Sequence, residues 1–64
     1  MNERDLLAFE SAMQAIDEAI HTVTSEIDRD HLSETTLARL STVEAELRRS
    51  RVSLEKLMRD YPHP

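Results

Sequence analysis

The chain has 64 residues, a formal net charge of −5, no cysteine and no glycine. So short a chain has room for a single domain, residues 1–64, and the lack of cysteine excludes disulfides as a source of stability. The three histidines are not spaced to share one helical face, so we expect neither a structural zinc ion nor another cofactor. Association with another chain is the remaining way to stabilise so small a core.

The composition indicates helix throughout. Glycine is absent and both prolines fall in the last three residues, whereas glutamate, arginine, leucine and alanine are abundant. No apolar run approaches the roughly 20 residues that span a bilayer. We therefore expect an all-α, cytoplasmic protein that makes no membrane contact.

The first helix is predicted at about residues 3–29. Asn2 is its expected N-cap, and Asp5 places negative charge in the first turn, where the helix dipole favours it. Its apolar residues recur at alternating spacings of three and four, which is typical of a continuous helical seam. These residues are Leu6, Phe9, Met13, Ile16, Ile20, Val23 and Ile27.

A polar turn at about residues 29–33 precedes the second helix, which is predicted at about residues 34–60 with Ser33 as its N-cap. A loose tail, 61–64, is expected after it. The second helix carries a similar ladder: Leu40, Val43, Leu47, Leu54, Leu57 and Tyr61. Ser50 interrupts this ladder, either as a small residue that lets the helices approach or as a notch for a side chain of a partner.

Two long helices joined by so short a turn predict an antiparallel, coiled-coil-like hairpin. Ala12 and Ala19 widen the first ladder on one flank, and Leu37 and Met58 widen the second. Widened ladders are typical of helices in bundles. We therefore predict that the hairpin is completed to a four-helix bundle, either by homodimerisation or by a larger protein whose groove accepts it.

The charges are distributed unevenly. Residues 1–30 contain eight acidic and two basic residues, whereas residues 31–64 contain six basic and five acidic ones. Arg48, Arg49 and Arg51 form the one basic cluster, expected opposite Asp17 and Glu18, where the arginines either form surface ion pairs or contact a partner. A further row of possible partner contacts follows the back of the second helix: Ala38, Ala45 and Val52.

No arrangement of residues suggests catalysis, because the chain has no glycine-rich phosphate loop, no cysteine nucleophile and no histidine grouped with a serine and a carboxylate. We predict a non-enzymatic interaction module, such as a small adaptor, inhibitor or co-chaperone that acts through an amphipathic helical face. One alternative is a dimeric hairpin regulator that binds RNA or DNA, which the acidic first half disfavours. A purely structural dimerisation module is the other.

Overall fold

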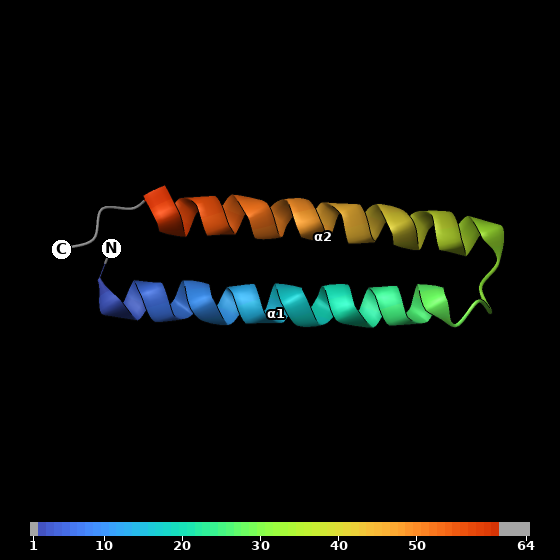
Figure 1. The fold of residues 1–64 in the computed structure, drawn as a ribbon, viewed down its shortest axis with the longest axis horizontal. Coiled ribbons are helices and arrows are strands. Elements are labelled where there is room, and N and C mark those ends of the chain that lie inside the picture. The colour runs from blue at the N-terminus through green and yellow to red at the C-terminus, as the bar shows by residue number, and fades with distance from the viewer. Residues whose placement is uncertain (1, 61–64) are drawn as a thin grey trace.

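The computed structural model describes residues 2–60 of the chain. Helix α1, Glu3–Asp28, and helix α2, Glu34–Asp60, pack against each other along their length. They run antiparallel, so the start of α1 and the end of α2 lie at the same end of the molecule (Figure 1). The predicted all-α helical hairpin is confirmed, and it contains no strand within the described residues.

Both helices begin at the capping residues expected from the sequence. The Asn2 side-chain oxygen accepts a hydrogen bond of 2.8 Å from the Asp5 backbone N–H. The Ser33 hydroxyl oxygen accepts one of 3.2 Å from the Thr36 backbone N–H. Each cap satisfies one of the backbone donors that a helix N-terminus otherwise leaves without a partner.

The turn between the helices depends on one left-handed residue. Arg29, the C-cap of α1, has helical backbone angles, and Asp30 follows with a φ of 53°. Glycine commonly occupies this position after a helix because it has no Cβ to clash. The chain contains no glycine, and aspartate is among the few other residues that tolerate the left-handed region.

The hairpin is thin and elongated. Its principal extents are 50 × 15 × 11 Å, and its radius of gyration is 14.9 Å, compared with about 11 Å for a compact domain of this length. Ile20 is the only buried hydrophobic residue within the described part of the chain. The two helices therefore share a seam rather than enclose a core.

Candidate interaction surface

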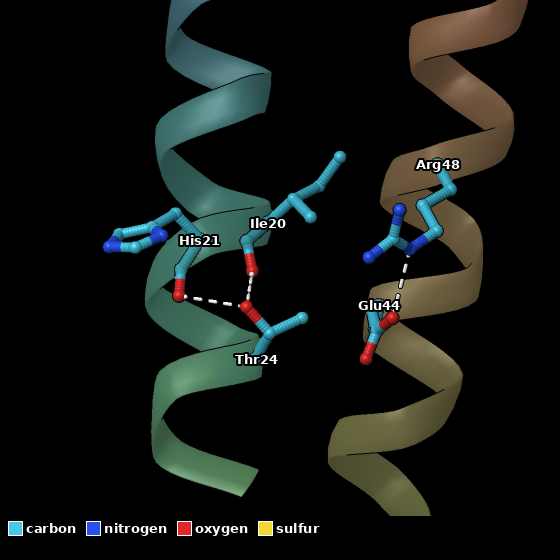
Figure 2. A network of polar contacts seen from close by, with 5 residues as sticks. All are labelled: Ile20, His21, Thr24, Glu44 and Arg48. Carbon is cyan, nitrogen blue, oxygen red and sulfur yellow. Dashed lines mark hydrogen bonds and ion pairs between the residues drawn. The ribbon is translucent and has the colours of Figure 1, made fainter. Parts of the chain in front are cut away.

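The seam residues of α1 are those of its predicted ladder. All seven ladder residues are half-buried or buried, and Ile20 is only 9% exposed. Ala19, Thr24 and Glu26 are half-buried beside them. Figure 2 shows Ile20 projecting from α1 toward α2, whereas His21 points away from it. The Thr24 hydroxyl donates to backbone oxygens of α1, Ile20 O and His21 O, both at 3.0 Å, and so is satisfied without a partner on α2.

The seam of α2 differs from its predicted ladder. Its half-buried residues are Leu37, Leu40, Glu44, Leu47, Arg51, Leu54 and Met58. Leu37 and Met58, expected on the flank, therefore lie in the seam, whereas Val43 and Leu57 are each 43% exposed. Glu44 and Arg51 are the two charged residues at seam positions. Charged residues can lie there because long polar side chains cover apolar surface with their stems while their charged ends reach water.

Arg51 makes the cross-helix ion pair of the hairpin. It donates to the Asp17 carboxylate on α1 and, at 2.8 Å, to Glu55 on its own helix. The hydrogen bond and the charge of Asp17 raise the pKa of Arg51 above its already high usual value. Asp17 directly follows the seam residue Ile16, and Glu55 directly follows Leu54. The residues that directly follow these seam positions therefore lie on the same side of the hairpin in both helices. We call this side the charged side.

The other two arginines of the basic cluster do not reach α1. Arg48 pairs with Glu44 on its own helix at 2.9 Å (Figure 2). Arg49 is exposed and forms no ion pair within residues 2–60. Of the expected contacts between this cluster and Asp17 or Glu18, the structure therefore contains the one made by Arg51.

The opposite side of the hairpin is apolar. Over the middle of both helices it consists of the seam residues that lie farther from Asp17 and Glu55, and of the residues that directly precede the other seam positions. These residues are Phe9, Ala12, Ile16, Ala19 and Val23 from α1, and Leu40, Val43, Leu47, Ser50, Leu54 and Leu57 from α2. We call it the open apolar side. Over this stretch none of its residues is charged, and Ser50 is its one polar residue. Beside the turn, the same flank of α1 carries half-buried Glu26, which pairs with Arg29. The open apolar side extends over the middle of both helices, and no further element covers it within residues 2–60.

The remaining predicted contact residues lie elsewhere. Ala38, Ala45 and Val52 are exposed, and Val52 is 63% exposed. Val43 and Val52 are nine residues apart, which at 3.6 residues per turn places them on opposite faces of α2. The predicted seam residue Tyr61 and the predicted tail 61–64 lie outside the described residues.

Residues 2–60 enclose no pocket and bring together no group of histidine or acidic residues able to hold a metal ion. Neither helix in this range is long and apolar enough to cross a membrane. Comparison with protein-family models, curated proteins and solved structures gives no match for this chain. The surfaces of the hairpin are therefore the features from which a function can be inferred.

Proposed function

We propose that the protein is a non-enzymatic protein–protein interaction module that acts through the open apolar side of its hairpin. The observation that carries this proposal is the continuity of that side over the middle of both helices, residues 9–23 and 40–57, where it carries no charged residue. Extended apolar surface bordered by polar residues is typical of protein interaction sites. The role is that of a small adaptor, inhibitor or co-chaperone.

In this proposal the occupant of the open apolar side supplies a second helical layer and completes a four-helix bundle. Exposed Val43 and Leu57 would then become buried, and so would the exposed edges of the seam leucines on α2. Such burial contributes about 25 cal/mol for each Å² of apolar surface removed from water.

A cytoplasmic location stays a prediction from the sequence, and fractionation of cells producing a tagged chain would check it.

Site-specific photo-crosslinking in cells tests the proposal. A photoreactive amino acid at Val43 lies on the open apolar side, and the same residue at Val52 lies on the opposite face of α2. We expect a discrete cross-linked product from position 43 and none from position 52. The mass of that product distinguishes a second copy of the chain from another protein, and the absence of any product from position 43 would overturn the proposal.

The nucleic-acid alternative has less support. Arg48 and Arg51 are both paired with carboxylates, and α1 carries seven acidic residues against one basic residue. Phosphate backbones are bound by lysine and arginine side chains that are free to displace counterions. A mobility-shift assay with mixed RNA and DNA at low salt would separate the two functions, because binding driven by phosphate contacts is strongest there.

A further inference from the structure

We infer that the occupant of the open apolar side is a second copy of this chain, packed so that each α1 lies against the α2 of the other copy. This inference rests on the proposed function and identifies the partner. Two observations carry it: the amount of surface that the single hairpin leaves exposed, and the distribution of charge between its helices.

The hairpin exposes more surface than a compact domain of its mass, and this excess is similar to the area that a stable dimer buries on each partner. The accessible surface of the chain is 5128 Å², about 900 Å² more than a compact folded monomer of 7.4 kDa is expected to expose. A protein–protein interface of standard size buries about 800 Å² on each partner. Covering the open apolar side with a second hairpin would therefore bring the chain close to the exposure of an ordinary folded domain.

The charges select one arrangement of the two copies. Residues 3–28 carry a net charge of −6, and residues 34–60 carry +1. Two hairpins that meet through their open apolar sides can place α1 against α1 or α1 against α2. The first arrangement brings the two acidic helices together, whereas the second separates them and places each beside a helix that is nearly neutral and rich in arginine. Repulsion between like charges therefore favours the second arrangement.

The same arrangement fixes the direction of the bundle. When each α1 lies against the α2 of the other copy, neighbouring helices remain antiparallel only if both turns, 29–33, lie at the same end. The α1-against-α1 arrangement is antiparallel only if the turns lie at opposite ends. The position of the turns is therefore a measurable consequence of the charge argument.

Two pairs of matched variants locate the interface. Val43→Asp and Ala12→Glu place a carboxylate on the open apolar side from α2 and α1, while Val52→Asp and Ala38→Glu place one on the back row of α2. An unpaired charge at an interface is costly, so we expect both open-side variants to raise the dimer dissociation constant at least about 30-fold. We expect the back-row variants to leave it within about threefold.

The measurement is sedimentation equilibrium of the full chain over a range of concentrations, with circular dichroism on the same samples. We expect the wild type to be a helical dimer at low micromolar concentration. Ala12 is exposed in the single hairpin and lies in mid-helix, where glutamate is tolerated, so Ala12→Glu tests the interface even if Val43→Asp unfolds. A monomeric wild type, an oligomer other than a dimer, or disruption by the back-row variants alone would overturn the inference.

A label pair measures the direction of the bundle. The chain has no native cysteine, so Thr35→Cys places one spin label per copy beside the turn. We expect a short distance between the two labels, and a separation approaching the 50 Å length of the hairpin would overturn the proposed arrangement. A monomer in solution that still cross-links to another protein from position 43 in cells would refute the second copy as partner and leave the interaction function standing.

Discussion

The two helices contribute differently to the seam between them. The seam ladder of α1 contains only apolar residues, among them Ile20, the one hydrophobic residue buried within residues 2–60. The seam of α2 includes Glu44 and Arg51, and none of its residues is fully buried. Helix α1 therefore supplies the more continuous apolar row of the seam, and α2 supplies the arginine that pairs with Asp17 across it.

The difference follows from how α2 is turned about its own axis. Its most regular apolar row, which includes Leu40, Val43, Leu47 and Leu54, is centred about 60° from the middle of its seam. The leucines of this row lie at the edge of the seam, and Val43 lies outside it. Helices in bundles commonly have an apolar row in this position, between the neighbouring helix of their own layer and the face that packs against a second layer.

The largest expected effect comes from the buried residue of α1. Replacing a buried isoleucine by alanine removes apolar contacts and leaves a cavity, so we expect Ile20→Ala to lower the free energy of unfolding by about 3 kcal/mol. Urea titration followed by circular dichroism measures this change. Leu7→Ala is the matched control because Leu7 is 59% exposed on the same helix. Equal losses in the two variants would contradict the assignment of Ile20 to the centre of the seam.

The next largest loss of stability is expected from a substitution in the turn. Asp30 has a φ of 53°, and a β-branched residue at such a position is more strained than aspartate or asparagine. We expect Asp30→Val to destabilise the hairpin by about 1 to 2 kcal/mol and Asp30→Asn to be nearly neutral. Thermal unfolding of the two variants at equal protein concentration compares them. A valine variant as stable as the asparagine variant would argue against the left-handed turn.

Replacing the acidic residue in the seam of α2 by an apolar one tests this difference between the helices. Glu44 is half-buried, with 25% of its side chain exposed, and its carboxylate accepts from Arg48 on its own helix rather than from a residue of α1 within the described part of the chain. We expect Glu44→Leu to raise the free energy of unfolding by about 1 kcal/mol through added apolar burial. The control is Glu46→Leu, on the exposed surface of α2. If Glu44→Leu gives no gain over this control in a urea titration, the seam position of Glu44 is contradicted.

The N-cap of α2 is expected to matter at a similar or smaller level. Ser33→Ala removes the hydroxyl that accepts from the Thr36 N–H, and such losses cost about 1 kcal/mol. Ser53→Ala is the control because Ser53 lies exposed in the helix interior, where alanine is the better helix former. Thermal unfolding should therefore shift in opposite directions for the two variants, and shifts of the same sign would refute the capping role.

These features differ in how far the sequence could predict them. The hairpin follows from the two apolar ladders, from Asn2 and Ser33 as caps, and from the polar turn, all of which are local signals. The rotation of α2 could not be predicted in the same way, because Leu37 and Met58 continue one ladder while Val43 and Leu57 continue another. Which ladder faces α1 depends on the packing of both helices.

The ion pair of Arg51 illustrates the same limit. The sequence predicts three arginines opposite the acidic residues of α1, but the spacing alone does not distinguish which of them reaches across. Arg51 does so because it occupies a seam position. Arg48 directly follows the seam residue Leu47, so it lies on the exposed flank and pairs with Glu44. Once the rotation of α2 is known, the assignment follows from the helical period alone.

The smallest expected effect concerns the pH dependence of this pair. The Asp17 carboxylate raises the pKa of Arg51 in the folded chain. A basic group whose pKa is higher in the folded chain stabilises the fold at every pH below the pKa that the same group has in the unfolded chain. Both values lie far above neutrality. The difference in melting temperature between the wild type and Arg51→Gln should therefore stay constant between about pH 6 and pH 10.

Arg51→Lys provides the contrast, because lysine keeps the positive charge but titrates near pH 10.4. Its melting temperature should follow that of the wild type near neutrality and fall toward that of Arg51→Gln as the pH passes about 10. If all three proteins melt together at every pH, the pair is only a surface contact, and the orientation of α2 is set by its apolar residues. If the differences follow this pattern, the ion pair to α1 helps to hold Arg51 in the seam, and thereby keeps the apolar row of α2 turned toward the open apolar side.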